Sequence, residues 1–537
     1  MNFFSATMEF GLLKVAFLIS FLILCWPLES AYNFSRINLP PEHLPFFFNS
    51  FPDAAEACRK DDRCPYKMHL DREACWGYED NCVIGGTASY SKPSCPGDHK
   101  GWVQTKQAQI ATFFSQGDFG YVRDKLRDMK MMCEPTFRED SSLECTKHLH
   151  YCRGRNIMIN FTDLAQRPEM FRYKMDVLKE GQIGGYCRLE SKRLEAEGDQ
   201  LSPLQSWGPE MRNFVSLPKR PIESGDCTLV IDKPTYIMKI DAAVNMYHHF
   251  CDFLNLYASF HMNSSYAFGD GSSYFGQDNL MVIWETHPYQ SAFEEAFSAF
   301  THHPVLNLRS LEGQVVCFRN VIFPLLPRMI FGLYYNTPLI WGCHKSGLFH
   351  AFSRHMLHRL GVTRTPARRH EGKIRVTLMS RDTPYRRILN EEELIAGLEE
   401  NPDYSVRRVV YNRFMSFRRQ LEITHNSDIF IGVHGAGLTH LLFLPDWGVV
   451  FELYNCEDES CYLDLARLRG VKYLTWENKT LLYQQDQGHH PEGGAHAKFT
   501  NYAFDVAEFL RIVEKGARYV LSQRSFKNYK AEMHDEL

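Results

Sequence analysis

Several features that would place this chain in a familiar class are missing. Its 60 lysines and arginines do not outnumber its 64 aspartates and glutamates, so a net charge of −4 offers no positive field for nucleic acid. None of the 16 cysteines forms a C-x-x-C pair, which argues against a thioredoxin-type redox site and a zinc ribbon. No internal repeat or low-complexity tract is visible. What remains is a globular composition, with 44% hydrophobic and 23% charged residues.

Long apolar runs are also scarce, and the one that exists stands at the start of the chain. Residues 15–26 are apolar, follow Lys14 and precede the small residues Ser30 and Ala31. A helix of that length rises about 18 Å, well short of the ~30 Å hydrocarbon core of a bilayer. The pattern predicts that residues 1–30 are a secretory signal peptide, with an uncleaved anchor as the alternative. We expect no other transmembrane span.

The opposite end carries a second targeting feature. The last four residues, His534, Asp535, Glu536 and Leu537, match the signal by which a receptor retrieves proteins to the endoplasmic reticulum. Together with a signal peptide, they predict residence in the lumen of the reticulum and binding to that receptor. Four sequons fit a glycosylated luminal surface, and we expect N-glycans at Asn33, Asn160, Asn263 and Asn478.

Because the lumen is oxidising, the cysteines are first interpreted as disulfides. Removing Cys25 with the signal peptide leaves an odd number, and most of the remainder crowd into residues 58–187. We expect Cys251 to stay unpaired because it lies within a helical pattern. Cys456 and Cys461 are near enough in sequence to close a small loop.

The 537 residues suffice for about three domains. Residues 31–224 are cysteine-rich and irregular, whereas strands and helices alternate from residue 225 onward. That alternation favours an α/β fold with parallel sheets covered on both faces. A basic, proline-containing linker at 361–373 then predicts two Rossmann-like domains, at 225–361 and 373–522, with a cleft between them and a tail at 523–537.

Each Rossmann-like domain has its own expected elements. For the first, we expect strands at 228–231, 279–284, 315–318 and 321–323, and helices at 242–262, 293–300 and 349–360. For the second, we expect strands at 374–379, 406–411, 428–433, 449–453 and 472–476, and helices at 390–399, 414–425 and 437–444.

The sharpest candidate site follows the strand at 428–433, where glycines open a helix. Glycine lets backbone N–H groups approach a ligand, and a helix N-terminus favours an anion. The loop lies beyond the carboxyl end of its strand, where ligands of open α/β sheets bind. It is neither a G-x-G-x-x-G fingerprint nor a Walker loop, and its small residues can equally serve tight packing. We expect a diphosphate to bind at His434, Gly435, Ala436, Gly437, Thr439 and His440.

A second candidate is the arginine-rich loop at 380–390. Arg381, Arg386 and Arg387 can neutralise a diphosphate through planar guanidinium groups, and we rank Arg387 and Arg381 above Arg386. The alternative is an ordinary solvated loop. Asn390 would cap the following helix, and Glu452, at the end of a strand, could accept hydrogen bonds from a ribose.

The third candidate is one face of the helix at 242–262. Asn245, His248 and Asp252 stand at i, i+3 and i+7, and His248 and Asp252 are an i, i+4 pair within reach of a hydrogen bond. A His–Asp pair at a cleft can accept the proton of a hydroxyl, so we expect Asp252, directly or through His248, to be the catalytic base. His249 is the next candidate, and a structural role is the alternative.

A metal–diphosphate motif of the D-x-D type is absent. We interpret the acidic cluster at 457–459 as a loop or helix start. A transferase built on this chain would then stabilise its leaving diphosphate with arginines and a helix N-terminus, since both provide positive charge. We therefore expect no required cofactor, with a divalent cation such as Mn²⁺ as the alternative.

These three motifs together resemble glycosyltransferase family 61. They are the N-x-x-H-x-x-x-D helix, the arginine loop and the H-G-A-G-x-T-H loop, and segments at 75–78, 234–239, 325–328 and 439–447 extend the similarity to one member over nearly the whole mature chain. The resemblance implies a GT-B-type pair of Rossmann-like domains and an inverting transfer of N-acetylglucosamine from UDP-GlcNAc. It implies Ser or Thr of folded EGF-like domains as acceptors, Notch receptors among them.

One position departs from that family pattern. Relatives carry Asp-Tyr-Asp after Ala-Phe-Thr, and here His302, His303 and Pro304 stand there. Two other functions remain open. One is a family 61 enzyme that transfers xylose or acts on O-mannose, and the other is a non-catalytic luminal chaperone for EGF modules.

Overall fold

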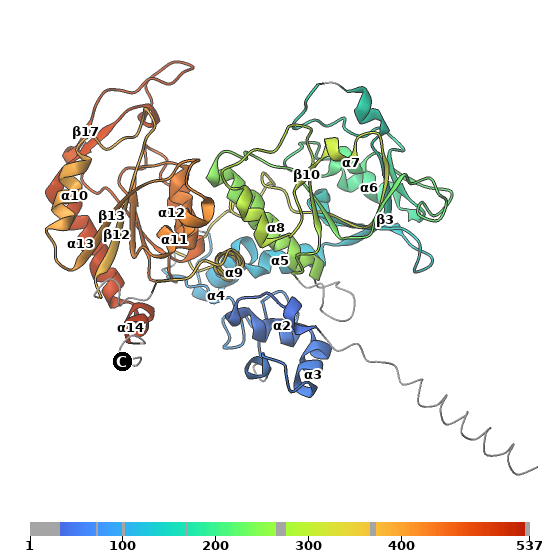
Figure 1. Ribbon diagram of the computed structural model, residues 1–537, viewed down its shortest axis with the longest axis horizontal. Helices are drawn as coiled ribbons and strands as arrows, with labels where there is room; N and C mark the ends of the chain where they lie inside the picture. The colour runs from blue at the N-terminus through green and yellow to red at the C-terminus, as the bar shows by residue number, and fades with distance from the viewer. Residues whose placement is uncertain are drawn as a thin grey trace, which may run out of the picture.

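The computed structural model describes residues 33–70, 73–98, 102–167, 169–264, 275–365 and 372–531. The predicted signal peptide and the retrieval signal lie outside the described residues. Within these ranges, no helix is both long enough and apolar enough to span a bilayer. The chain forms two α/β halves, with helices α4 (Lys106–Gly117), α5 (Phe119–Arg127) and α9 (Gly347–Arg359) between them (Figure 1).

The C-terminal half is built on a five-stranded parallel sheet. Its order is β13 (Tyr404–Val410), β12 (Ile374–Ser380), β14 (Ile429–Gly432), β15 (Val449–Glu452) and β16 (Lys472–Thr475). Every residue of β12 is buried, as expected of a strand with both faces covered. In Figure 1, α10 (Glu391–Glu399) and α13 (Val506–Ser522) cover one face, and α11 (Phe417–His425) and α12 (Cys461–Arg469) cover the other. The predicted covered parallel sheet is confirmed here.

The N-terminal half contains a larger, mixed sheet. Its main path is β10 (Leu306–Asn307), β9 (Leu280–Ile283), β8 (Thr235–Met238), β11 (Val315–Phe323), β3 (Cys152–Asn160), β2 (Ser142–Cys145), β1 (Lys130–Glu134) and β5 (Arg188–Leu189). Strands β8 to β11 run parallel to one another, as does β7 (Leu229–Ile231), but β11 pairs antiparallel with β3. The strands within 225–361 are therefore parallel, as expected, but the whole sheet is mixed because strands from before residue 224 join it antiparallel.

Strands from the cysteine-rich region complete this sheet. β1, β2, β3, β5 and the short β4 (Ile183–Gly185) and β6 (Phe214–Ser216) all precede residue 224, yet β3 and β11 pair along their full lengths. β3 alternates buried residues such as Ile157 with half-buried arginines, and the sequence analysis did not recognise this alternation as a strand. The domain boundary at residue 224 stays a prediction, but it falls within one hydrogen-bonded sheet.

Most other expected elements are present with shifted ends. The expected helices at 293–300 and 437–444 are 3₁₀ helices, η6 (Glu294–Ala299) and η9 (Ala436–Phe443), and the expected strands at 315–318 and 321–323 are the single strand β11. The helix expected at 242–262 is α8 (Met246–Ser264). Several elements were not predicted from the sequence: β8, α12, α13 and the hairpin of β17 (Leu482–Gln484) and β18 (Tyr502–Phe504).

Six disulfides tie the described cysteines together. They join Cys58–Cys64, Cys75–Cys82, Cys95–Cys343, Cys133–Cys187, Cys145–Cys152 and Cys227–Cys317. Cys251 is buried and unpaired, as predicted. The predicted link between Cys456 and Cys461 is wrong: Cys456 packs in the core of the C-terminal sheet, whereas Cys461 packs against the other hydrophobic core.

The four sequons differ in exposure. Asn33 and Asn478 are exposed, whereas Asn160 and Asn263 are half-buried. The Asn263 amide donates to the hydroxyl of Tyr236 at 3.2 Å. Glycosylation at all four sites stays a prediction.

A buried aspartate caps the N-termini of two of the central helices. The carboxylate of Asp118 accepts hydrogen bonds from the backbone N–H of Phe119, at the start of α5, and from those of Gly347 and Leu348, at the start of α9. It also accepts one from Ser91 Oγ at 2.8 Å. These bonds satisfy N–H groups that have no partner within their own helices. One side chain therefore fixes α5 against α9.

We expect Asp118→Asn to lower the free energy of unfolding by about 2–4 kcal/mol, because an amide replaces one acceptor oxygen with a donor and leaves buried N–H groups without partners. Denaturant unfolding of the intact chain would measure this. Asp128→Asn, at an exposed position, is the matched control and should change stability by less than about 0.5 kcal/mol. Equal effects of the two substitutions would contradict the assignment.

Candidate functional site

A cavity of about 530 Å³ is lined by both halves of the molecule. Asn245, Tyr247 and His248, at the start of α8, lie on one side of it. Arg386 and the loop of His434, Gly435 and Ala436 lie on the other. Its volume is within the range of about 300–1,000 Å³ that is usual for ligand sites. The structure thus brings together parts of all three sites predicted from the sequence.

The glycine loop is shaped by its contact with arginine. Gly435 has φ +153°, and a Cβ atom there would collide with Nη1 of Arg381. Glycine at this position therefore allows a guanidinium to lie directly against the backbone. Gly437 serves packing instead, since a Cβ there would meet Met379 Sδ at 2.7 Å.

Two of the three predicted arginines gather at this loop. Arg386 Nη1 donates to the backbone carbonyl of His434 at 3.1 Å, and Arg381 lies against Gly435. Among the described residues, no carboxylate forms an ion pair with either guanidinium. Burial, followed by the nearby charge of Arg386, lowers the pKa of Arg381 to about 10. Two half-buried positive charges without a protein counter-ion make a site for an anion.

Arg387 is placed differently. Its side chain is exposed, and its backbone N–H donates to Asn501 Oδ1 at 2.9 Å. It does not line the cavity. The ranking of Arg387 above Arg386 therefore finds no support in the geometry, since Arg386 lines the cavity and Arg387 does not.

His434 is held by a carboxylate. Its Nδ1 lies 2.8 Å from Glu452 Oε1, and Glu452 is wholly buried and accepts a hydrogen bond from the Tyr473 hydroxyl at 2.5 Å. Glu452 thus fixes the ring of His434. The predicted contact between Glu452 and a ribose is not supported, because both carboxylate oxygens are occupied inside the protein.

Three other residues that were predicted to bind the donor are held within the fold instead. Nδ1 of His440 donates to the carbonyl of Gly437 at 2.9 Å, and burial lowers the pKa of this histidine to about 4. Thr439 is wholly buried. Asn390 makes paired hydrogen bonds with the backbone of Phe504 and gives no side-chain cap to α10. None of the three lines the cavity.

The predicted pair of His248 and Asp252 does not form. Asp252 is 3% exposed, contacts His249 Nδ1 at 3.0 Å and accepts from the backbone N–H of Asp241. The carboxylate of Asp252 is thus held between His249 and the backbone of Asp241, and it makes no contact with His248 among the described hydrogen bonds. Burial raises the pKa of Asp252 well above its usual value and lowers that of His249 to about 3.

His248 is paired with Asp241 instead. Its Nδ1 lies 2.9 Å from Asp241 Oδ2, and Arg328 holds the same carboxylate through Nε at 2.7 Å and Nη2 at 3.1 Å. Burial favours a higher pKa for Asp241, but hydrogen bonds from His248 and Arg328 outweigh it and hold that pKa below its usual value. The carboxylate is therefore ionised. Nδ1 of His248 lies against this carboxylate and also 3.1 Å from Nη2 of Arg328, and in the tautomer in which Nδ1 donates to Asp241, Nε2 is free to accept a proton.

Sequence analysis missed Asp241 and Arg328. Asp241 stands three residues after the end of β8, which was itself not predicted. Arg328 ends one of the segments that carry the family resemblance, at 325–328, but that segment suggested no role for it.

The sequence is similar to known proteins over nearly its whole length. The family model for Glycosyltransferase 61 matches residues 246–451. The EGF domain-specific O-linked N-acetylglucosamine transferase of Drosophila melanogaster is 52% identical over 504 residues, which cover 93% of this chain and 94% of the relative. This chain belongs to glycosyltransferase family 61. Proteins of the same name from Rattus norvegicus and Xenopus laevis are 47% identical over 515 residues (95% of this chain, 94% of the relative) and 49% identical over 493 residues (91% of each).

The family 61 segment covers most of the cavity. It starts at α8, with His248, and includes Arg381, Arg386 and the loop at 434–436, so both walls belong to the matched region. Asp241 lies outside it.

Replacing Arg381 or Arg386 with alanine should weaken UDP binding about 10–150-fold, because each substitution removes a charge-assisted contact worth about 1.5–3 kcal/mol. Calorimetric titration with UDP measures this directly. Arg387→Ala is the matched control from the same loop and should leave the affinity unchanged. If only Arg387→Ala weakened binding, the diphosphate would lie outside this cavity.

Proposed function

We propose that this chain is an inverting glycosyltransferase that moves N-acetylglucosamine from UDP-GlcNAc to Ser or Thr hydroxyls of folded EGF-like domains. The observation that carries the proposal is 47–52% identity over more than nine-tenths of the chain with relatives named EGF domain-specific O-linked N-acetylglucosamine transferase. The cavity between the two halves supports it, because it combines an anion site with a carboxylate-held histidine.

The two halves would act as the two domains of a GT-B-type enzyme. In this proposal, the domain at 373–522 binds the nucleotide sugar, and the domain at 225–361 provides the catalytic base. Loops and helix starts from both halves line one cavity, and this supports the arrangement.

The donor diphosphate would lie between Arg381, Arg386 and the N–H groups that follow Gly435. The two guanidiniums have no carboxylate partner in the described part of the chain, so binding a diphosphate would offset the cost of burying their charge. As the bond from the anomeric carbon to the diphosphate breaks, negative charge grows on the leaving oxygen, and this fixed positive charge stabilises it. The same charge makes a metal unnecessary in this proposal.

The acceptor hydroxyl would attack from the opposite side and invert the anomeric centre. Nε2 of His248 takes the hydroxyl proton as the new bond to the anomeric carbon forms. Asp241 then stabilises the imidazolium through Nδ1. This replaces Asp252 as the proposed base, because Asp252 lies outside the cavity and is enclosed by His249 and backbone.

The partners and location follow from the same proposal. Six disulfides fit an oxidising compartment of the secretory pathway. We propose residence in the lumen of the endoplasmic reticulum, retrieval through His534, Asp535, Glu536 and Leu537, and EGF-like domains of extracellular proteins, Notch receptors included, as acceptors.

The decisive experiment is incubation of purified protein and a folded EGF module with a panel of UDP-sugars, read by mass shift. UDP-GlcNAc should add one N-acetylhexosamine, and excess EDTA should change the rate by less than about threefold, or roughly 0.7 kcal/mol in barrier. Transfer of xylose, or of GlcNAc to an O-mannosyl peptide, would favour the alternative family 61 activities. No transfer with any donor, together with binding of the module, would favour a chaperone.

His248→Gln should lower turnover by about 10²–10⁴-fold while UDP binding is retained, since it removes the proton acceptor and leaves the arginines in place. Asp241→Asn should lower turnover less than His248→Gln does. Asp241→Glu, which keeps a carboxylate, should retain part of the turnover that Asp241→Asn loses. Asp252→Asn is the control from the same helix and should retain more activity than His248→Gln. The opposite order would return the role of base to Asp252.

A further inference from the structure

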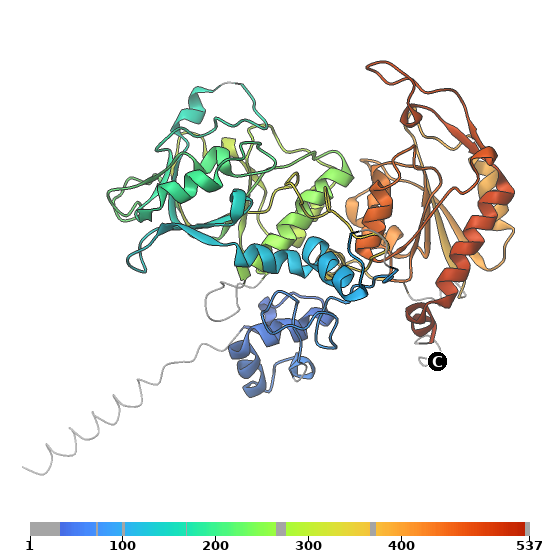
Figure 2. The ribbon, with the colours of Figure 1, turned by 180° about the vertical axis from the view of Figure 1, so that it is seen from behind.

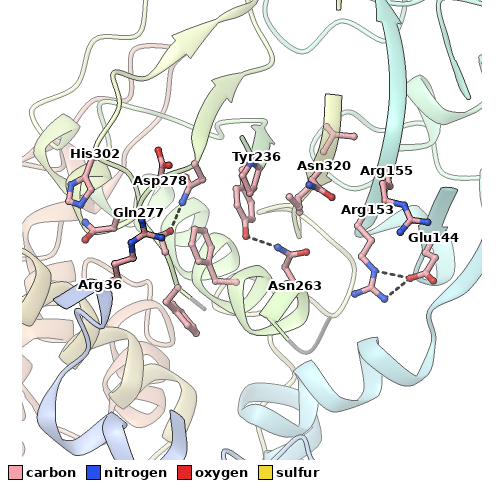
Figure 3. A pocket seen from close by; sticks show the side chains of 18 of the residues that line it. Arg36, Glu144, Arg153, Arg155, Tyr236, Asn263, Gln277, Asp278, His302 and Asn320 are labelled. Carbon is pink, nitrogen blue, oxygen red and sulfur yellow. Dashed lines mark hydrogen bonds and ion pairs between the residues drawn. The ribbon is translucent and has the colours of Figure 1, made fainter. Parts of the chain in front are cut away.

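A second and larger cavity, of about 900 Å³, lies in the N-terminal half. Its walls come from the sheet strands β2, β3, β8 and β11, the last turn of α8, and the segments 36–38 and 275–279. Figure 3 shows Arg36 and His302 at one end, Arg153, Arg155 and Glu144 at the other, and Tyr236 and Asn263 between them. The cavity is therefore elongated, with cationic groups at both ends.

This cavity is separate from the candidate active site. The two share no lining residue. α8 connects them, with His248 in its first turn and Asn263 in its last. Fifteen residues of α-helix span about 22 Å, so a small ligand cannot occupy both places.

The charge in the cavity is positive and only partly balanced. Of the four arginines that line it, Arg153 forms an ion pair with Glu144 at 2.5 Å. Arg36, Arg155 and Arg359 have no carboxylate partner among the described residues. The cavity's other acidic residue, Asp278, is already engaged by Lys233 and by His303.

Several buried polar atoms in the wall lack a partner. Nε of Arg155 and Nη1 of Arg359 are buried with no hydrogen-bond acceptor, and burial lowers the pKa of Arg359 to about 10. Oδ1 of Asn279 is buried without a donor, and this residue is 3% exposed. These three atoms are closed off from the cavity and cannot themselves contact a ligand. The two terminal nitrogens of Arg155 are not among the closed-off atoms, and in the described part of the chain no hydrogen bond is formed by them, so they are the donors that Arg155 offers to the cavity.

The middle of the cavity suits a sugar. The Tyr236 ring stacks on Phe260 with centroids 4.5 Å apart, and its hydroxyl accepts from Asn263. Asn320 and Gln277 add further amide groups to the wall. Aromatic carbon next to amides and a hydroxyl provides the apolar contact and hydrogen bonds that a saccharide requires.

We propose that this cavity binds an anionic saccharide, whose sulfate or phosphate groups contact Arg155 at one end and Arg36 at the other. The sugar ring lies between, against Tyr236 and the surrounding amides. Planar guanidiniums suit such groups because two N–H donors can contact two oxygens of one sulfate or phosphate. This site acts independently of the donor cavity and does not depend on the proposed transferase activity.

Calorimetric titration of the full chain with a disulfated disaccharide, its unsulfated parent and glucose 6-phosphate tests the proposal. The disulfated probe should bind with a Kd of about 1 mM or tighter, at least tenfold tighter than the parent. Comparison with glucose 6-phosphate distinguishes sulfate from phosphate as the preferred anion. Arg155→Gln should weaken binding of the better probe about tenfold or more.

Three controls make the outcome decisive. Arg319→Gln removes an arginine on β11 that pairs with Asp232 outside the cavity, and it should leave binding unchanged. UDP should not displace the probe, and the thermal unfolding midpoint of Arg155→Gln should equal that of the parent protein, which reports correct folding. If Arg155→Gln fails that check, Arg36→Gln, at an exposed position, replaces it. Absence of saturable binding, equal affinity for the unsulfated parent, or displacement by UDP would overturn the proposal.

Discussion

The first N–H groups of two helices, α5 and α9, donate hydrogen bonds to one carboxylate, that of Asp118. These bonds fix the two helices at the centre of the molecule. Through α5, Asp118 reaches α8, which carries His248; through α9, it reaches η9, which follows the glycine loop. The disulfide Cys95–Cys343 ties the chain just before α9 to the N-terminal region. In Figures 1 and 2, α5 and α9 lie between the two halves. The position of His248 relative to the anion site thus depends on Asp118, which belongs to neither of them.

On one side of the active-site cavity a buried carboxylate is paired with cations, and on the other side two half-buried guanidiniums have no carboxylate partner among the described residues. Asp241 is neutralised by Arg328 and His248, which leaves a rigid pair with one nitrogen available. Arg381 and Arg386 lie side by side at Gly435 without a counter-ion among the described residues. Desolvating two unpaired cations costs free energy, and a bound diphosphate offsets that cost. A site of this kind gains affinity for the nucleotide at the expense of stability in its absence.

The N-terminal half has a role beyond that of an accessory region. Its strands β1, β2 and β3 extend the sheet that begins with β8 and β9, and four of its disulfides join cysteines that both precede residue 190. His303, the middle residue of the triplet at 302–304, contacts Asp278 at 2.7 Å, and His302 lines the large cavity. The departure from the family pattern therefore lies at the second cavity, remote from the proposed base.

The sequence alone determined the family, the parallel sheet of the C-terminal half, the unpaired Cys251 and the three segments that meet at the active-site cavity. These follow from local periodicity and from motifs whose residues are close in the chain. Only the tertiary structure decided which side chains line that cavity. Asp241, from the loop after β8, is the partner of His248, whereas Asp252 bonds to His249 and to the backbone of Asp241. Arg386 contacts the glycine loop and Arg387 is exposed, although the two are adjacent in the sequence. Pairing of β3 with β11 joins residues about 160 positions apart, and no local pattern specifies such a partner.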